Sequence, residues 1–534
     1  MTSAVSAVQP TSTWAPLSSP TYRALWIAQL VSNLGTWMQT VGAQWMLVGD
    51  PRAPVLVPLV QTATTLPVML LALPSGVLAD LIDRRRLLIA TQGAMAAGVG
   101  LLACLTGAGL TTPTVLLTLL FLVGCGQALT APAWQAIQPD LVPREQIPAA
   151  AALGSISMNG ARAIGPAIAG VLVSISGPTL VFALNAVSFV GIVAVLIMWR
   201  SPAAEQLLPA ERPLAALSAG GRFIRSAPII RRILLRAVLF IAPASALWGL
   251  LPVIAKDQLG QSSSGYGLML GALGVGAVLG AVVLSRLRSR FGQNALLIAA
   301  ALGFAAAAAV LALVHNVAVV LAALVIGGAA WLLALSTLNA SMQLSLPAWV
   351  RARGLSVYQL VFMGGQAVGS LLWGLLAGAT GSVTALLVSV GLLLVCAVSS
   401  LWWPLHARTG SLDLTPSTHW PEPHLVFEPE PPDGPVVVLT YYRVDPRDET
   451  DFFAAMALLG RSRQRTGASQ WRLMRCVEQE STFVETFVVR SWGEHMHQHR
   501  TRLTGHDLLV EQRVEQYVQG EPVSQHLIAV NTAR

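Results

Sequence analysis

The pattern of hydrophobic and polar positions divides the chain into two unlike parts. Before residue 405, apolar segments of about 20 residues alternate with short polar breaks, and a helix needs about this length to cross a bilayer core of roughly 30 Å. We therefore predict an all-α polytopic membrane region with twelve transmembrane helices. The predicted spans are 24–48, 55–79, 87–107, 114–136, 150–175, 179–199, 233–255, 266–286, 294–314, 317–341, 354–379 and 382–404.

The two halves of this region repeat each other at a constant shift of 204 residues. The pattern predicts two six-helix pseudo-repeats, residues 21–199 and 233–405. Parallel repeats of this kind occur in secondary transporters, where a central site is exposed alternately to the two sides of the membrane. The matching pairs are Gly76 with Gly280, Arg84 with Arg288, Arg86 with Arg290, Pro143 with Pro347, Gly160 with Gly364, Gly165 with Gly369 and Gly170 with Gly374.

Charge is distributed unevenly along the 534 residues, of which only 11% are charged. Residues 1–408 hold 21 Lys and Arg against 8 Asp and Glu, whereas residues 409–534 hold 12 against 17. The basic residues of the membrane region concentrate in alternate connections, and by the positive-inside rule these connections and both termini face the cytoplasm. The expected partner of the basic part is therefore the lipid bilayer, and no nucleic acid is expected.

The segments outside the spans have distinct compositions. Residues 1–20 are predicted to be a disordered tail, and they lack the basic start of a signal peptide. Residues 200–232 are predicted to be a cytoplasmic central loop. Residues 406–435 are rich in proline, which favours an extended linker. Residues 436–534 read as strands and helices in the order β-α-β-β-α-β, which predicts a small cytoplasmic α+β domain with a ferredoxin-like fold.

Two motifs resemble the major facilitator superfamily. Gly76–Arg85 is similar to the family's loop between helices 2 and 3, G-x-L-A-D-[R/K]-x-G-R-[R/K], with Leu81 in place of a basic residue and Asp83 in place of the second glycine. Ala161–Gly170 resembles the helix-5 motif of the exporters, G-x-x-x-G-P-x-x-G-G. The intramembrane arginine that the family carries in helix 4 is absent here, so its proton-relay role is not transferred to this chain.

Further segments resemble one branch of that superfamily. Residues 159–166 and 361–374 are similar to the enterobactin-exporter-like branch, also called the transmembrane secretion effectors. Residues 491–500 resemble a helix of the C-terminal domain that some members carry, a domain similar to antibiotic-biosynthesis monooxygenases, which are usually dimeric.

This resemblance implies a secondary active exporter of a small hydrophobic or siderophore-like molecule, placed in a bacterial inner membrane and coupled to protons. It implies no cofactor and no enzymatic activity of the transporter. ATP drive is not expected, because the chain has no G-x-x-x-x-G-K-[ST] loop. The alternatives are a broad-specificity drug efflux pump and a transporter fused to a cofactor-independent monooxygenase-like domain. We favour a regulatory domain, or one that self-associates, over a catalytic one.

The resemblance also assigns a conformational latch to Gly76, Asp80, Arg84 and Arg85, with Asp80 paired to arginines in one closed state. The alternative is a solvated loop whose arginines only set the topology.

Arg162 is the strongest single candidate for a substrate-binding residue. It lies near the middle of a predicted span, where a charge costs roughly 2.5–3.5 kcal/mol and usually marks function. Its repeat partner is the neutral Gln366, and Asn159 lies one helical turn before it. We predict that Arg162 receives an anionic or catecholate-like group in the central cavity, against the alternative of a structural role.

Polar and aromatic residues recur on single helical faces and predict the cavity wall, since such walls suit bulky amphipathic ligands. For any one tryptophan the alternative is a packing or interfacial role. The predicted wall consists of Asn33, Trp37, Gln44, Gln127, Trp134, Trp331 and Asn339.

Small residues and two carboxylates complete the membrane candidates. Gly165, Pro166 and Gly170 are predicted to bring the span 150–175 against the span 266–286 of the other half, where Gly276 and Gly280 provide a face of small residues. Asp50 follows the span 24–48 and Asp257 follows the span 233–255, both at the expected outer side of the membrane. They are possible proton-linked residues, and the alternative is that both are simply solvated.

The C-terminal domain carries His495 and His499 four residues apart, a spacing that suits metal binding. The sequence offers no third ligand that can be placed beside them, so no metal site is predicted.

Overall fold

The computed structural model describes residues 12, 14–199, 224–405, 412–417, 420, 425–427 and 429–529. They divide into two compact units, which we describe separately. The first, the membrane unit, comprises Met1–Leu207, Arg236–Leu338 and Gln359–Pro404. The second comprises Leu208–Leu235, Asn339–Tyr358 and Leu405–Arg534, and its residues 412–529 are called here the soluble domain. Residues 1–11 and 13 of the predicted disordered tail, and residues 200–223 of the predicted central loop, lie outside the described residues. The prediction of disorder is wrong for the end of the tail, where Ala15–Ser18 form a 3₁₀ helix that leads into the first long helix.

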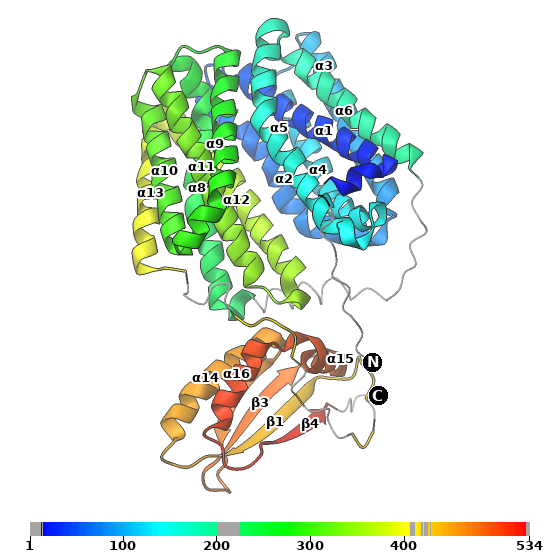
Figure 1. The fold of residues 1–534 in the computed structure, drawn as a ribbon, viewed down its shortest axis with the longest axis vertical. Coiled ribbons are helices and arrows are strands. Elements are labelled where there is room, and N and C mark those ends of the chain that lie inside the picture. Colours follow the sequence, from blue (N-terminus) through cyan, green and yellow to red (C-terminus); the bar gives the residue numbers. More distant parts are fainter. Residues whose placement is uncertain are drawn as a thin grey trace. The chain divides into compact units, whose positions relative to one another are not determined.

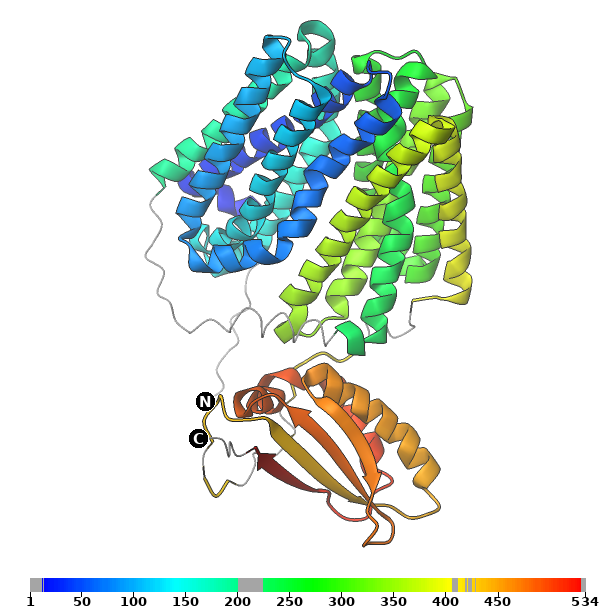
Figure 2. The same ribbon diagram turned by 180° about the vertical axis from the view of Figure 1, so that it is seen from behind.

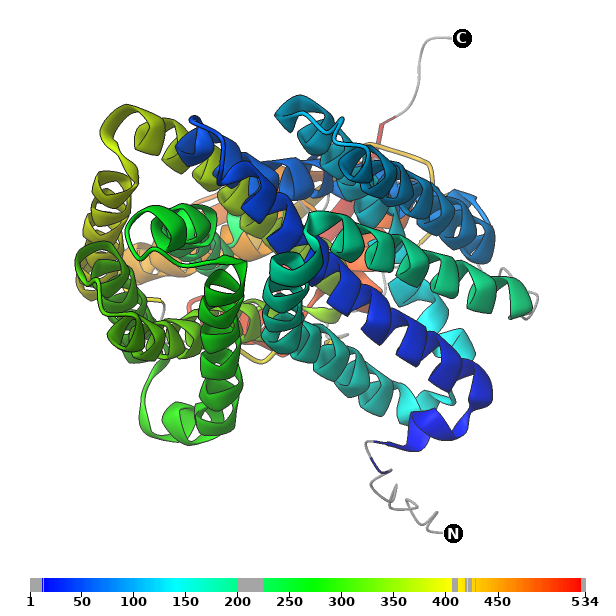
Figure 3. The same cartoon turned by 90° about the horizontal axis from the view of Figure 1, so that it is seen from above.

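Long helices build the membrane part of the chain (Figure 1). The first six are α1 (Pro20–Leu47), α2 (Ala53–Leu81), α3 (Arg84–Gly107), α4 (Pro113–Leu141), α5 (Ile147–Ser176) and α6 (Pro178–Met198). The remaining six are α8 (Pro228–Asp257), α9 (Ser263–Arg290), α10 (Gln293–Leu313), α11 (Val317–Leu344), α12 (Arg351–Thr380) and α13 (Ser382–Trp402). Each predicted span lies within five residues of the bounds of one of these helices. In the view from above, helices α1–α6 gather on one side and the green-to-yellow helices on the other (Figure 3).

Eleven of the helices in the described part of the chain are long and apolar enough to cross a membrane. The exception is α1, whose length suffices but whose sequence carries Gln29, Asn33, Gln39 and Gln44, which lower its hydropathy. The fold is therefore a mostly helical, multi-pass membrane protein. The count of twelve spans and the pseudo-repeat stay predictions.

Polar side chains start several of these helices by accepting hydrogen bonds from backbone N–H groups that have no partner within the helix. Ser19 accepts from the backbone N–H of Tyr22, and Thr112 accepts from that of Val115. Asp83, which stands where the family loop has glycine, accepts from the backbone N–H of Arg86 at 2.8 Å. This departure from the family pattern thus caps helix α3.

A four-stranded antiparallel sheet forms the centre of the soluble domain, with helices packed on one face (Figure 2). The elements follow the predicted order, and the strands lie in the spatial order β2-β3-β1-β4. On β1 the side chains alternate between buried and half-buried, which is the signature of a sheet with one covered face. The elements are β1 (Val436–Arg443), α14 (Glu449–Thr466), β2 (Ser469–Arg475), β3 (Thr482–Val489), α15 (Trp492–His497), a π-helical turn (Gln498–Arg502), α16 (Gly505–Glu515) and β4 (Val523–Ile528). The assignment to the ferredoxin-like fold stays a prediction.

The described parts of the proline-rich linker differ from the extended spacer that we predicted. Pro416 pairs with Thr504 in an isolated β-bridge, and the backbone N–H of Ser417 donates to Leu503 O at 2.9 Å. The Trp420 indole N–H donates to Glu511 Oε1 at 2.7 Å. An indole that buries its ring needs an acceptor for its N–H. These residues therefore belong to the soluble domain.

Candidate functional site

The two halves of the membrane unit meet around a small cavity near the middle of the helices. Its volume is about 10 Å³, which is about the space that one water molecule needs. Helices α1, α5, α8, α9 and α11 all contribute to its wall. The residues that define it include Trp37, Arg162, Trp248, Leu270, Gly274 and Trp331.

Arg162 is the charged residue of this cavity. It lies in the middle of the 30-residue helix α5, and its guanidinium carbon lies 5.5 Å from the centre of the Trp37 ring. Such a cation–π contact contributes about 0.5–2 kcal/mol, which is less than the cost of a charge at the bilayer centre. Its Nε is buried and has no hydrogen-bond partner among the described residues. The guanidinium therefore keeps at least one donor for a ligand.

Tryptophan rings enclose the cavity on two sides. The ring centres of Trp37 and Trp248 lie 6.4 Å apart, and those of Trp248 and Trp331 lie 5.6 Å apart at an interplanar angle of 62°. Phe240 and Phe304 back Trp331 at 5.9 and 5.7 Å. The Trp248 indole nitrogen is buried and, like Arg162 Nε, has no partner among the described residues. The site thus joins two unpaired donors with an aromatic wall.

Trp248 is the residue that sequence reasoning missed. It lies on α8, for which no polar face was proposed. A signal was nevertheless present, because Trp248 lies 204 residues after Gln44 and so occupies the repeat position of a residue that was proposed.

The other residues of the predicted wall divide into several environments. Gln44 accepts a hydrogen bond from the Tyr266 hydroxyl at 2.5 Å, which joins α1 to α9 of the other half. Asn33 donates to Ser157 Oγ at 3.0 Å, which joins α1 to α5.

Four further candidates lie away from the residues that define the cavity. Trp134 packs against the apolar core of the N-terminal bundle. Gln127 is half-buried and Gln366 is buried, and neither is among the cavity residues. Asn339 belongs to the second unit, where it is exposed and accepts from Gln343 Nε2 at 2.9 Å.

Asn159 differs from its predicted position beside Arg162. Its side chain is exposed and donates to the backbone oxygen of Ser155 at 2.9 Å. A residue three positions away shares a helical face only approximately, and here the difference in angle turns Asn159 out of the cavity.

Glycines bring α5 and α9 into backbone contact. A Cβ atom built on Gly170 lies 2.9 Å from Gly267 Cα and 2.6 Å from Ser263 O. The predicted contact of Gly165 with α9 is wrong, because a Cβ atom on Gly165 lies 2.9 Å from Trp37 Cβ on α1 of the same half. Pro166 is buried, and its backbone oxygen lies at the interface of α5 with α9, 2.6 Å from a Cβ atom built on Gly267. Small residues at this interface therefore set the distance between the two halves.

Gly276 and Gly280 have a different neighbour from the one predicted. Cβ atoms built on them lie 1.9 Å from Val325 O and 3.0 Å from Ala329 Cα, both on α11. The face of α9 that meets α5 carries Gly267, Gly271 and Gly274 instead. The expected partner was wrong because α9 has small residues on two faces, and spacing alone does not tell which face meets which helix.

The proposed latch is only partly visible. The surroundings of Gly76 and the side chain of Asp80 lie outside what the structure describes. Arg85 donates through Nε to Leu196 O at 2.7 Å and through Nη2 to Ile197 O at 2.8 Å, so it closes the end of α6 in its own half. Arg84 occupies the first position of α3 and is exposed.

The two candidate proton-linked residues lie at the ends of α1 and α8. Asp50 accepts from the backbone N–H of Arg52 at 2.8 Å and from its Nε at 3.3 Å. These hydrogen bonds hold the pKa of Asp50 below its usual value, so this carboxylate stays ionised near neutral pH. Asp257 ends α8 and is exposed.

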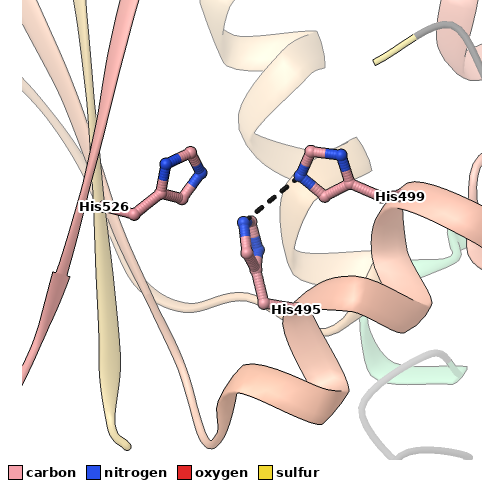
Figure 4. A group of neighbouring side chains, drawn as sticks. All are labelled: His495, His499 and His526. Carbon is pink, nitrogen blue, oxygen red and sulfur yellow. Dashed lines mark hydrogen bonds between the residues drawn. The ribbon is translucent and has the colours of Figure 1, made fainter. Parts of the chain in front are cut away.

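The soluble domain contains a second and larger cavity, with a volume of about 1230 Å³. It lies against β1 and β4 and is lined on its helical side by Arg463, His495, His499 and Glu511. The sequence offered no third ligand that could be placed beside His495 and His499, and the structure places one there. His526, on β4, lies next to both (Figure 4).

The family model described as transmembrane secretion effector matches residues 11–534. An enterobactin exporter EntS of Shigella boydii serotype 4 is 27% identical over 384 residues, which cover 70% of this chain and 90% of that protein. An enterobactin exporter EntS of Citrobacter koseri is 28% identical over 397 residues, which cover 72% of this chain and 92% of that protein.

Solved transporter structures share the fold at low sequence identity. A bacterial homolog of the human lysosomal transporter Spinster, inward-facing and occupied, matches with a TM-score of 0.59 at 15% identity, over 76% of this chain and 98% of the other. The nucleoside transporter NupG, as its D323A mutant, matches with a TM-score of 0.58 at 15% identity, over 71% and 98%. The helical part of the chain therefore has a transporter fold.

Proposed function

Because the chain belongs to the transmembrane secretion effector family of the major facilitator superfamily, we propose that it is a secondary active exporter. Its cargo is a small hydrophobic or siderophore-like molecule, moved outward by alternating access across the inner membrane. The enterobactin exporters, which match over most of their length, support the siderophore-like class.

The observation that carries this proposal is the pair of unpaired donors in the central cavity. Arg162 Nε and Trp248 Nε1 are buried and have no hydrogen-bond partner within the described part of the chain, and buried donors that lack an acceptor are rare enough to need an explanation. An anionic or catecholate-like oxygen supplies the missing acceptor. The cavity of about 10 Å³ has no room for an aromatic cargo in this state, so the proposal requires a state in which the two halves separate here. The rings of Trp37, Trp248 and Trp331 then offer stacking surfaces to the aromatic part of such a molecule.

The contacts between the two halves support alternating access. Besides contacts near the middle of the helices, such as Gly364 with Met69, they join the C-terminal parts of α1, α5 and α12 to the N-terminal parts of α2 and α9. The pairs at this end are Gly170 with Gly267, Gln44 with Tyr266, and Gly374 with Pro58. Since helices alternate in direction, these parts lie at the end of the membrane unit where α1 passes into α2, which we call the α1–α2 end. The positive-inside rule assigns this end to the outside and both termini to the cytoplasm. The structure then corresponds to a state closed at its outer end.

Proton coupling is part of the proposal, although Asp50 is a poor carrier because its hydrogen bonds favour the ionised form. Neither it nor the exposed Asp257 is needed if the cargo itself carries the proton. Export that stops when an uncoupler dissipates the proton gradient supports this coupling. Export that continues under the uncoupler excludes it.

Comparison of the medium from cells with and without the protein tests the export itself. We expect one compound to disappear from the medium and to accumulate inside cells that lack the protein. If susceptibility to added toxic compounds changes and no native compound moves, the protein is a drug efflux pump instead.

Substitution of Arg162 tests the cargo site. Arg162→Gln is expected to reduce transport of an anionic cargo at least tenfold, because it removes the positive charge and the paired N–H donors of the guanidinium group. The amount of protein in the membrane should stay the same. Arg162→Lys, which keeps only the charge, should restore part of the activity. Ser174→Ala, on the exposed surface of the same helix, serves as the control. Unchanged transport and specificity in Arg162→Gln would exclude the binding role.

We also propose that the soluble domain regulates the transporter or self-associates, and is not catalytic. Its cavity supports a ligand-binding role. Native mass spectrometry of the full chain tests self-association. Turnover of an aromatic substrate by the protein, lost on mutation of the cavity, would favour the fused monooxygenase-like reading.

A further inference from the structure

Three histidines from two segments of the soluble domain meet at the wall of its cavity. His495 lies on helix α15, His499 lies in the π-helical turn Gln498–Arg502, and His526 comes from strand β4 (Figure 4). One ring nitrogen from each lies within 4.8 Å of the others. Turns of π-helix are rare in proteins, and those that exist often lie at functional sites.

The distances suit a metal ion. His495 Nε2 and His499 Nε2 lie 3.2 Å apart. Two nitrogens bound tetrahedrally to zinc at about 2.0–2.1 Å are about 3.3 Å apart. Two of the ligands therefore already have the required separation, and the third closes by a shift of about 1.5 Å or less, given the same ideal geometry.

The hydrogen bonds around His495 determine which of its nitrogens is free. The Thr466 hydroxyl donates to a backbone oxygen of its own helix, Ser462 O or Arg463 O, each at 3.1 Å. It therefore accepts from Gln498 Nε2, at 3.3 Å, and this orients Gln498 Oε1 toward His495 Nδ1, at 3.1 Å.

An amide oxygen only accepts, so His495 Nδ1 carries the hydrogen and His495 Nε2 presents a lone pair toward His499. This is the arrangement of a metal-binding histidine, in which the far ring nitrogen donates to a protein oxygen and fixes the tautomer.

His499 is free to adopt the matching tautomer. Its Nδ1 is buried and has no hydrogen-bond partner among the described residues. Without a metal, His499 Nε2 donates its hydrogen to His495 Nε2. A metal ion replaces that hydrogen once the proton moves to Nδ1, so both Nε2 atoms become ligands without a change in the charge of the rings.

The surroundings keep the imidazoles neutral, as metal ligands must be. Burial, reinforced by neighbouring histidines, lowers the pKa of His495 to about 3 and that of His499 to about 4. Burial also lowers the pKa of His526. The nearby cation Arg463 forms ion pairs with both Glu485 and Glu511, so the formal charge of these three side chains is −1.

We propose that His495, His499 and His526 bind one divalent transition-metal ion of the Zn²⁺ class. Imidazole nitrogen is a ligand of choice for Zn²⁺ and its neighbours in the first transition row. All three residues line the cavity of about 1230 Å³, so a fourth coordination position faces it. Three protein ligands with one open position leave room for water or for a donor atom of a molecule in the cavity. The site is independent of the proposed export.

Metal titration of the full chain tests this site. The protein, purified without a polyhistidine tag, is stripped with a chelator, reconstituted in nanodiscs and titrated with Zn²⁺ and with Co²⁺. We expect one equivalent of bound metal and the visible absorption of tetrahedral Co²⁺. His499→Gln and His526→Gln should each weaken binding strongly, and Gln498→Ala, which frees the His495 tautomer, should weaken it by about 10- to 100-fold.

The matched control is His497→Gln. His497 lies on α15 beside the site but is exposed, so its loss should leave the affinity unchanged. X-ray absorption of the metal-loaded wild type counts its imidazole ligands and needs no variant, which separates loss of a ligand from loss of folding. The proposal is overturned if the wild type binds no stoichiometric metal, if fewer than three imidazoles coordinate it, or if His499→Gln and His526→Gln bind as the wild type does.

Discussion

Valine in place of Gly170 should shift the conformational equilibrium of the membrane unit. Gly170 lies on α5 in contact with α9 of the other half, at the α1–α2 end. A Cβ atom at this position lies 2.6 Å from Ser263 O and 2.9 Å from Gly267 Cα. Both neighbours are backbone atoms, which cannot move aside as a side chain can. The two helices must therefore separate, and the closed state at this end loses stability.

The size of the effect follows from the cost of overpacking. Extra methyl groups in a well-packed contact cost typically about 1–3 kcal/mol. The open state at this end has no such contact and does not bear the cost. A difference of 1–3 kcal/mol changes the ratio of the two states by roughly 5- to 150-fold. Gly160→Val, on the same helix, is the control, because a Cβ atom there has no described atom within 4 Å.

Distances between spin labels measure this shift directly. Leu110 and His315 are both exposed, lie in the connections between α3 and α4 and between α10 and α11, and so report on the α1–α2 end of the two halves. Labels at these positions, in a background without the native cysteines, should show a longer distance in Gly170→Val than in Gly160→Val or the unmodified chain. Identical distributions in all three would refute the argument that this glycine contact holds the end closed.

Two further predictions concern stability. Gly276→Ala should lower the free energy of unfolding by about 1–3 kcal/mol, because the added Cβ atom overlaps Val325 O. Thermal unfolding in detergent should show this loss. Gly93→Ala is the control and should show none, because a Cβ atom at that position has no described atom within 4 Å. The soluble domain should lose stability as the pH falls below about 6.5. In the folded domain the pKa is about 3 for His495 and about 4 for His499, so the unfolded chain, whose histidines have ordinary pKa values, binds protons first. The loss of stability therefore continues until the pH reaches these lower values. Thermal unfolding between pH 7 and pH 4 measures it, and a double His495→Gln, His499→Gln variant with the same slope would contradict this origin.

The sequence determined the elements of this protein. The spans follow from runs of apolar residues, and their ends follow from local features such as the cap at Asp83, so each predicted span falls within five residues of a helix. The mid-helix arginine was found in the same way, because position along a helix gives depth in the membrane. The change to alternating residues after 435 predicted the order of strands and helices in the soluble domain.

Only the tertiary structure decided which of these elements meet. How whole helices rotate against each other decides which face of α9 contacts α5 and which contacts α11. It also decides that Asn159 points away from Arg162 and that Trp248 completes the aromatic wall. The pairing of β4 with β1, which brings His526 to His495, joins residues far apart in the chain. Local patterns carry no information about such pairings, because the free energy that selects them comes from packing between elements and not from the preference of any one segment.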